Sequence, residues 1–241
     1  MIKDKKHFSL GLMLLASFFI VLFWIFTPTF GNGMNGLQYA DDMFNKLSKG
    51  SSYFIPKVAE KNEKFYGKNF EVSIDLGKPE VAESAAILFE HAGAAVVANG
   101  TELKIKGDLG KVLASALEDA DAMYKNKGTD VTTKYGYDNT NTKDEKVIFG
   151  SWWHALSKID KRLQLDGKVK EAKMVGDVMK KAVEPGYNYY GIEAKSVSEK
   201  AVLMTALLVF YVIYTLWFGF GVFYLFEGMG LSMKKGAKSE A

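Results

Sequence analysis

Residues 201–226 read AVLMTALLVFYVIYTLWFGFGVFYLF and contain neither a charged residue nor a proline. With a rise of about 1.5 Å per residue, a helix over this stretch would be roughly 39 Å long, which exceeds the roughly 30 Å hydrocarbon thickness of a bilayer. A core helix of a soluble protein usually carries a polar face, whereas here only Thr205, Thr215 and tyrosine hydroxyls interrupt the apolar surface. The stretch therefore predicts a transmembrane helix over residues 201–226.

A second uncharged run lies near the amino terminus. Residues 10–26 read LGLMLLASFFIVLFWIF and follow a lysine-rich segment, residues 3–6. This is the layout of a secretory signal or of a signal anchor. A cleavable signal usually ends in small residues, but residues 24–26 are Trp, Ile and Phe. We therefore expect an uncleaved signal anchor that forms a first transmembrane helix over residues 10–27.

Lysines beside both runs predict the orientation of the chain. They lie within residues 3–6, before the first run, and within residues 234–238, after the second. Because Lys and Arg are enriched on the cytoplasmic side of membrane proteins, residues 1–9 and 227–241 are expected in the cytoplasm. The middle of the chain, residues 28–200, is then expected on the opposite side, as the periplasmic domain of a plasma (inner) membrane protein.

Composition restricts the chemistry of the chain. There is no cysteine among its 241 residues. That excludes disulfide frameworks, c-type haem attachment, cysteine-ligated zinc and iron–sulfur clusters. The net charge is only +3, and Arg162 is the single arginine, the side chain best suited to gripping phosphates and bases. A nucleic-acid partner is therefore not expected, and the lipid bilayer is the first predicted partner.

The periodicity of the middle region predicts a membrane-anchored α+β fold. Within residues 28–69, apolar residues at helical spacing indicate a short amphipathic helix that ends near Gly50. Residues 70–127 then show strand and helix patterns in turn. The expected order is a strand (70–76), a helix (79–91), two strands joined by Asn99-Gly100 (94–98 and 101–106) and a helix (109–124). Together these segments predict a small sheet covered by helices on one side.

Two helices are expected after a long connection. Residues 128–149 are mostly polar and predict a loop. Residues 150–185 carry two amphipathic patterns that are separated at Asp166-Gly167, and Pro185 should end the second. They predict a helical hairpin or one bent helix.

The linker to the second membrane run covers residues 186–200. It contains three tyrosines, Tyr187, Tyr189 and Tyr190. Tyrosine suits the aromatic belt at a membrane surface, but packing against the α+β unit would explain these residues equally well. The sequence leaves both interpretations open.

No motif predicts a catalytic site, a metal or a cofactor. Ser151 follows Gly150 but lacks the G-x-S-x-G pattern, and no cysteine nucleophile exists. Among the three histidines, only His91 and His154 lie outside the cytoplasm in the expected topology. They are the candidates for a metal site, but neither has a second ligand at helical spacing. An enzyme would have to assemble its site from scattered residues.

Two acidic segments have ordinary explanations. Residues 138–145, DNTNTKDE, superficially resemble a calcium loop, but Lys143 stands where an EF-hand needs glycine and Phe149 where it needs glutamate. The EF-hand is therefore rejected, and cation binding there is a minor alternative. Residues 118–121 contain three carboxylates on a predicted helix, which we interpret as a solvated acidic face.

Aromatic residues indicate contact surfaces. Trp152 and Trp153 occupy adjacent helical positions and cannot both point into one core, so we expect one of them to face a partner, the membrane surface or a ligand. Packing within the domain is the alternative. In the second membrane run, glycines allow a neighbouring helix to approach, and intramembrane tyrosines favour polar partners. The expected contact residues there are Tyr214, Trp217, Gly219 and Gly221. We expect this helix to pack against other membrane subunits or further copies of the chain.

The layout of two terminal spans around one external domain is similar, in plan, to that of polysaccharide chain-length regulators and of some sensor proteins. The proline-rich signature expected beside the second span of the former is missing, and residues 227–241 are too few for a signalling domain. The leading hypothesis is a non-catalytic accessory or scaffold subunit of a multisubunit membrane complex. The alternatives are a membrane-anchored sensor or transport accessory with a ligand near Trp152 and Trp153, and a polysaccharide co-polymerase-like oligomer.

Overall fold

The computed structural model describes residues 2–137 and 143–231 and divides into two compact units. The terminal unit is built from both ends of the chain, up to Leu47 and from Lys195 onward. The central domain comprises Ser48–Ala194. The chain is mostly helical, with one small antiparallel sheet in the central domain.

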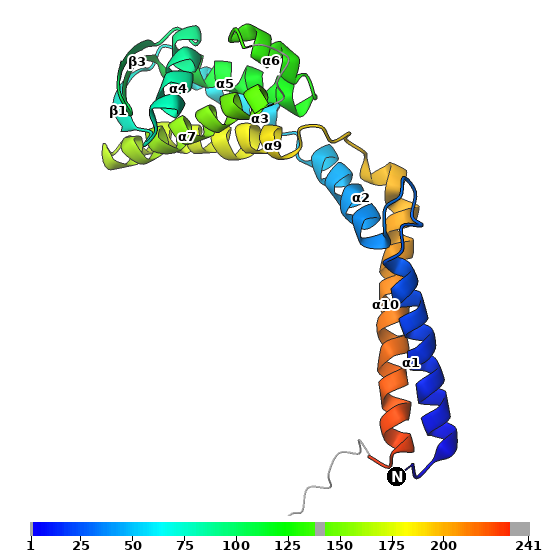
Figure 1. Cartoon of the computed structure of the whole chain (residues 1–241). Helices are drawn as coiled ribbons and strands as arrows, with labels where there is room; N and C mark the ends of the chain where they lie inside the picture. The colour runs from blue at the N-terminus through cyan, green and yellow to red at the C-terminus, as the bar shows by residue number, and fades with distance from the viewer. Residues whose placement is uncertain (1, 138–142, 232–241) are drawn as a thin grey trace, which may run out of the picture. The chain divides into compact units, whose positions relative to one another are not determined.

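Two long apolar helices dominate the terminal unit, α1 (Lys5–Ile25) and α10 (Val197–Gly228). Both are long and apolar enough to cross a membrane, and they lie side by side (Figure 1). Only 11% of the most apolar stretch of α1, and 0% of that of α10, is buried within the chain. The fold therefore leaves these apolar surfaces exposed, which differs from the core helices of soluble proteins.

Polar caps set the ends of the two helices. α1 begins before the predicted span because Asp4 accepts hydrogen bonds from the first-turn N–H groups of the helix. α10 extends past the predicted span at both ends, and Ser196 caps its start. At its other end, the carbonyl of Gly228 accepts the backbone N–H groups of Lys3 and Asp4 at 2.9 and 3.0 Å. The two residues that precede α1 thus satisfy a carbonyl at the end of α10.

Helix α2 (Gly36–Ser51) is the amphipathic helix predicted before Gly50, and it connects the terminal unit to the central domain. Asn35 and Gln38 bond reciprocally at its start, each side-chain oxygen accepting the other residue's backbone N–H at 2.9 and 3.0 Å. This is a capping-box arrangement. Residues 31–33 precede it, and all three have positive φ. The turn between α1 and α2 therefore uses left-handed backbone conformations, which glycine and asparagine adopt readily.

The elements of the central domain follow in chain order. They are α3 (Ile55–Asn62), η1 (Glu63–Phe65), β1 (Asn69–Asp75), α4 (Pro79–His91), β2 (Ala95–Asn99), β3 (Glu102–Asp108), α5 (Leu109–Tyr124), α6 (Gly128–Lys134), α7 (Lys143–Leu165), α8 (Val169–Val178), η2 (Met179–Val183) and α9 (Glu184–Asn188). The strand–helix–hairpin–helix order predicted for residues 70–127 is confirmed, and α4 and α5 have the predicted bounds.

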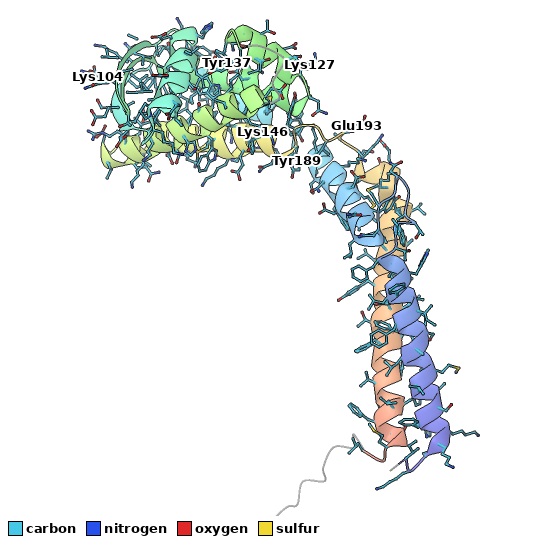
Figure 2. The ribbon with its side chains drawn as sticks, viewed as in Figure 1. Lys104, Lys127, Tyr137, Lys146, Tyr189 and Glu193 are labelled. Atoms are coloured by element: carbon cyan, nitrogen blue, oxygen red, sulfur yellow. The ribbon has the colours of Figure 1, made fainter. Side chains whose placement is uncertain are left out.

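The sheet has the order β1-β3-β2, and both outer strands run antiparallel to β3. Alternate residues of each strand point to the helices. They include Phe70, Val72, Ile74, Leu103 and Ile105, all at most 5% exposed. Helices α4, α5 and α7 contact the sheet, so the prediction of a sheet covered on one side is consistent with the burial pattern. The opposite face carries charged residues such as Lys104 (Figure 2).

The hairpin turn lies one residue later than predicted. Asn99 pairs with Glu102, so the two-residue loop is Gly100-Thr101 rather than Asn99-Gly100. Only Gly100 needs positive φ, at 62°. Glycine at the first loop position is the requirement of a type II′ turn, whose twist matches that of the strands.

Two further predictions for the central domain were wrong. The loop predicted over residues 128–149 contains α6, and α7 begins at Lys143. Pro185 does not end the second helix of the hairpin, because the chain continues into α9. Proline removes a helical N–H and its ring clashes with the preceding turn. The π-helical turn η2 lies directly before this position and widens the helix there.

Candidate functional site

The two adjacent tryptophans of α7 have opposite environments. Trp152 is 0% exposed and packs its ring against Phe89, with ring centroids 5.3 Å apart. Trp153 is 41% exposed. The prediction that both could not enter one core is confirmed, and Trp153 is the residue left available for contacts.

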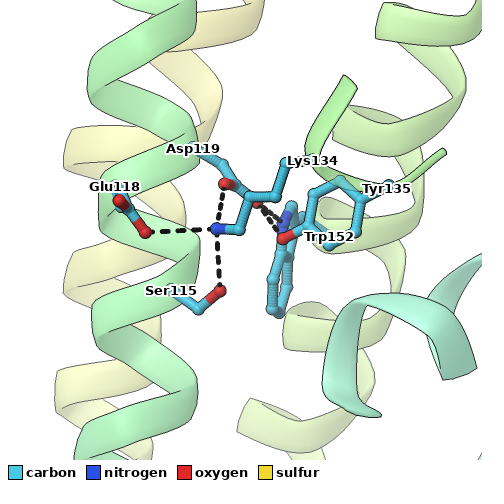
Figure 3. Close-up of polar contacts among 6 residues, drawn as sticks. All are labelled: Ser115, Glu118, Asp119, Lys134, Tyr135 and Trp152. Atoms are coloured by element: carbon cyan, nitrogen blue, oxygen red, sulfur yellow. Dashed lines mark hydrogen bonds and ion pairs between the residues drawn. The ribbon is translucent and has the colours of Figure 1, made fainter. Parts of the chain in front are cut away.

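A buried carboxylate fixes the orientation of Trp152 (Figure 3). Asp119, on α5, is 1% exposed. Its Oδ2 accepts the indole Nε1–H of Trp152 at 2.8 Å and the hydroxyl of Tyr135 at 2.5 Å, while Oδ1 accepts Lys134 Nζ at 2.7 Å. Three donors from α6, the residue after it and α7 therefore converge on one carboxylate.

Protonation states in this network follow from burial and charge. Burial alone would lower the pKa of Lys134, but its hydrogen bond and charge interaction with Asp119 outweigh burial and hold the pKa above its usual value. Burial, and then the negative charge of Asp119, raise the pKa of Tyr135. The raised pKa values keep both Lys134 and Tyr135 protonated, so that both act as hydrogen-bond donors to Asp119.

Asp119 was predicted on a solvated acidic face, and that interpretation was wrong. It lies three residues after Ala116 and seven after Val112, both of which are buried on the same side of α5. Its helical position therefore indicated burial, although its charge suggested exposure. Its neighbour Glu118 does fit the prediction, with a side chain 75% exposed.

A cavity of about 320 Å³ lies beside Trp153, between α7 and the η2–α9 segment. Its lining residues are Lys146, Phe149, Gly150, Trp153, His154, Val183, Glu184, Tyr187 and Asn188. Phe149 and Val183 are buried and form its apolar floor. A ligand near Trp152 and Trp153 stays a prediction; the cavity that could hold one is lined by Trp153 and not by Trp152.

The rim of this cavity combines aromatic and charged side chains. Tyr187 is 46% exposed, close to the value for Trp153. Lys146, labelled in Figure 2, brings a positive charge, and Glu184 brings a negative one. An apolar floor with a few polar groups at the rim is typical of sites that bind small molecules or the side chains of partner proteins.

The histidines do not assemble a metal site. His91 packs its ring against Tyr135, with centroids 5.1 Å apart, whereas His154 lines the cavity at Trp153. Within residues 2–137 and 143–231 no three His, Asp or Glu side chains are grouped as metal ligands. Most of the oxygen-rich segment 138–145 lies outside the described residues, so the alternative of cation binding stays untested.

A buried lysine forms a second polar centre that the sequence did not reveal. Lys49 is 2% exposed, and its ammonium donates to Asn126 Oδ1 at 2.9 Å and to the carbonyls of Tyr189 and Ile192 at 3.0 and 2.6 Å. Burial lowers its pKa. Because its three protons all have acceptors, this ammonium acts as a structural cross-link. Lys49 lies two positions after the buried Leu47, which on a helix is the opposite side, so helical spacing gave no signal of its burial.

The linker tyrosines pack against the central domain. The ring of Tyr189 lies 6.3 Å from that of Tyr124. Burial, and then a hydrogen bond to the buried Glu145, raise the pKa of Tyr190 to about 12. Of the two interpretations of the linker, domain packing therefore accounts for these two residues, while Tyr187 lines the cavity.

In the terminal unit, glycine permits close contact between α1 and α10. A Cβ on Gly221 would lie 2.9 Å from the side chain of Leu15, and a Cβ on Gly11 would collide with the backbone at Leu225. Gly219, by contrast, has no atom within 4 Å of its would-be Cβ. The helix that approaches Gly221 is thus α1 of the same chain, whereas Gly219 offers an open position on α10.

Two aromatic residues of α10 also face α1. The ring of Tyr214 stacks on Phe18 at 4.2 Å, and Trp217 meets the same ring edge-on at 6.4 Å. The hydroxyl of Tyr214 is buried and has no hydrogen-bond partner among the described residues. Exposed aromatic side chains, such as Phe220, cover other parts of α10.

Comparison of the chain with protein-family models, with curated proteins and with solved structures finds no significant match. The contact sites at Trp153 and on α10 are therefore interpreted from their own geometry.

Proposed function

We propose that the chain is a non-catalytic, membrane-anchored subunit of a larger membrane complex, whose central domain docks on a neighbouring subunit through Trp153. In this proposal α1 and α10 cross the plasma membrane, both termini are cytoplasmic and the central domain is outside. The exposed apolar surfaces of both helices support the membrane anchoring. The lysines that flank them support the orientation.

The observation that carries the docking proposal is the contrast between Trp152 and Trp153. The domain has a dense core in which Trp152 is fully buried and hydrogen-bonded, yet it leaves the next indole 41% exposed beside a cavity. Tryptophan is enriched among the residues that dominate the energy of protein interfaces. An aromatic anchor next to a pocket is the arrangement such interfaces use.

Purification from native membranes in a mild detergent tests this proposal. The wild-type chain should elute as a complex larger than its own mass plus detergent, with a reproducible partner. Trp153→Ala should remove that partner, and a photo-crosslinker at position 153 should attach to the same protein. Val147→Ala is the matched control, because Val147 is 44% exposed on the same helix but does not line the cavity. A partner retained by Trp153→Ala and uncrosslinked at position 153 would contradict docking at this residue.

The cavity itself favours a second candidate function, the binding of a small molecule by a sensor or transport accessory. Its floor of Phe149 and Val183 and its charged rim of Lys146 and Glu184 suit an apolar group that carries a polar substituent. Native mass spectrometry of the purified chain separates the two candidates. A lone chain with a bound metabolite that Trp153→Ala releases would favour this second function over docking.

A further inference from the structure

Strand β2 is an edge of the sheet, and it has the properties of a strand-pairing site. It pairs with β3 alone, and its five residues, AVVAN, carry no charge. Val97 is 66% exposed. Proteins usually protect such edges with charges, proline or a covering segment, because an apolar edge pairs readily with another strand. Neither charge nor proline protects β2.

The backbone groups of Val96 and Ala98 point outward from the sheet. The bonds from Leu76 N to Thr101 O and from Leu109 N to Lys68 O continue the β1–β3 ladder, so the odd-numbered residues of β3 bond to β1. The even-numbered residues then bond to β2, and Lys104 is the partner of Val97. Because hydrogen bonding alternates along a strand, the backbone N–H and C=O groups of Val96 and Ala98 face away from β3. No hydrogen bond joins their backbone groups to any residue in the described part of the chain.

We propose that β2 pairs with β2 of a second copy of this chain, antiparallel and with Val97 on the twofold axis. In this register Val96 of each copy lies opposite Ala98 of the other, and their outward N–H and C=O groups bond reciprocally. The two Val97 residues form the non-hydrogen-bonded pair between them, where Cα atoms are about 4.5 Å apart. The two small sheets become one continuous sheet.

Charge favours a second copy as the occupant. Because β2 has no charged residue, twofold pairing places no like charges opposite each other. The nearest charges on the exposed face are Glu102, Lys104 and Lys106 of β3, and Glu71 partly neutralises the two lysines at 3.0 and 3.5 Å. Three strand spacings of about 4.8 Å would separate these lysines from those of the second copy. That distance of roughly 14 Å exceeds the screening length of about 8 Å at physiological ionic strength.

Membrane anchoring supplies the strength that a short strand lacks. One five-residue strand buries far less than the roughly 1,200 Å² of a stable interface, so two freely diffusing domains would pair weakly. Two copies held in one membrane with the same orientation pair at a much higher effective concentration. This step rests on the proposed membrane anchoring, whereas the pairing register follows from the sheet alone.

A single cysteine tests the register, because the natural chain has none. Val97→Cys in isolated membranes should form a disulfide-linked dimer on mild oxidation, since a non-hydrogen-bonded pair has the Cα separation that a disulfide requires. Two matched controls stay monomeric: Ser73→Cys on β1, and Lys104→Cys on the central strand of the same exposed face. Equal dimer yields at all three positions, or a Val97→Cys adduct with a different protein, would overturn the proposal.

A second substitution separates pairing from random collision. Ala98→Pro removes one outward N–H but no hydrogen bond to β3. An edge strand tolerates proline at such a position. Added to Val97→Cys, it should lower the initial rate of dimer formation by about tenfold or more, since two intermolecular bonds are lost. An unchanged rate, with the fold intact by circular dichroism, would contradict pairing. A chain found outside the membrane would contradict the anchoring instead, and the cysteine yields measured at high concentration would still decide the register.

Discussion

The ammonium of Lys49 donates a 2.6 Å hydrogen bond to the carbonyl of Ile192, a residue 143 positions later in the chain. The central domain begins at Ser48 and ends at Ala194, so this bond joins the point where the chain enters the domain to the point where it leaves. Asn126 completes the junction, because its Oδ1 also accepts the N–H of Gly191 and its Nδ2 donates to Ile192. These contacts hold together the two ends of a domain that is inserted between two long helices.

Lys49→Met should lower the free energy of unfolding by about 1–3 kcal/mol, because it removes the three hydrogen bonds that the buried ammonium donates to oxygens of Asn126, Tyr189 and Ile192. Methionine keeps most of the apolar stem, so the loss reports on the ammonium. Denaturant unfolding of the full chain in detergent, followed by tryptophan fluorescence, measures it. Lys57→Met is the control, since Lys57 is exposed, and it should change stability by less than about 0.5 kcal/mol. Equal effects of the two variants would show that the junction is not stabilising.

Asp119→Ala should lower the free energy of unfolding by about 3 kcal/mol or more, because it leaves the hydroxyl of Tyr135 and the indole N–H of Trp152 without their acceptor and removes the closest ion pair of Lys134. Glu118→Ala, one residue earlier, should cost less than about 1 kcal/mol since its side chain is 75% exposed. Thermal unfolding of both variants measures the difference. Similar melting temperatures would mean that the carboxylate of Asp119 contributes no more than a surface charge.

Alkaline pH should destabilise the central domain through the buried Tyr124 and the partly buried Tyr190. Burial raises the pKa of Tyr124 and of Tyr190 to about 12, so the folded chain keeps protons that the unfolded chain loses near pH 10. Their contribution to the free energy of unfolding is complete below pH 10 and is lost as the pH rises towards about 12. Lys49 acts in the opposite direction, because its pKa is lowered in the folded state.

Tyr190→Phe isolates one of these effects. Unfolding free energies measured from pH 9 to pH 12 should fall less steeply for the variant than for the natural chain. Phenolate absorbance provides an independent check, because it should show delayed ionisation of fewer tyrosines in the variant. Parallel pH profiles of the two chains would contradict a raised pKa at Tyr190.

Gly221→Val and Gly219→Val form a matched pair on α10. They add the same side chain two positions apart, but only the first would collide with Leu15 of α1. Gly221→Val should therefore lower the melting temperature in detergent and weaken the α1–α10 pair, while Gly219→Val leaves both unchanged. A loss confined to Gly219→Val, accompanied by release of a partner, would instead place the important contact on the outer face of α10.

The sequence predicted the parts of the fold that depend on local pattern. Period-two alternation located β1, and Pro79 and Gly93 bounded α4, because these signals act through neighbouring residues. The turn was predicted at Asn99-Gly100, because this pair is a strong local turn signal. The strand register, which pairs Asn99 with Glu102, places the turn at Gly100-Thr101 instead, and register is not visible in the local sequence. Helix α6 lies where a loop was predicted. It depends on tertiary packing, which buries Val131 and Thr132 of an otherwise polar segment.

The site was only partly predictable for the same reason. Because Trp152 and Trp153 occupy adjacent positions on one helix, they were expected to differ in burial. Which of them is buried depends on the hydrogen bond to Asp119, 33 residues away in the chain. The burial of Lys49 likewise depends on partners 77 to 143 positions distant. Charge in the sequence suggested exposure, whereas hydrogen bonds formed only in the folded chain permit burial.

The central claim, that a bilayer separates the central domain from both termini, is tested most directly by cysteine labelling. Lys104→Cys and Lys5→Cys each give the cysteine-free chain one exposed thiol. In spheroplasts, a membrane-impermeant maleimide should label Lys104→Cys at once and Lys5→Cys only after the membrane is permeabilised. Labelling of both positions in intact spheroplasts, or of Lys5→Cys alone, would contradict this topology, and a chain released from membranes by carbonate washing would contradict the anchoring.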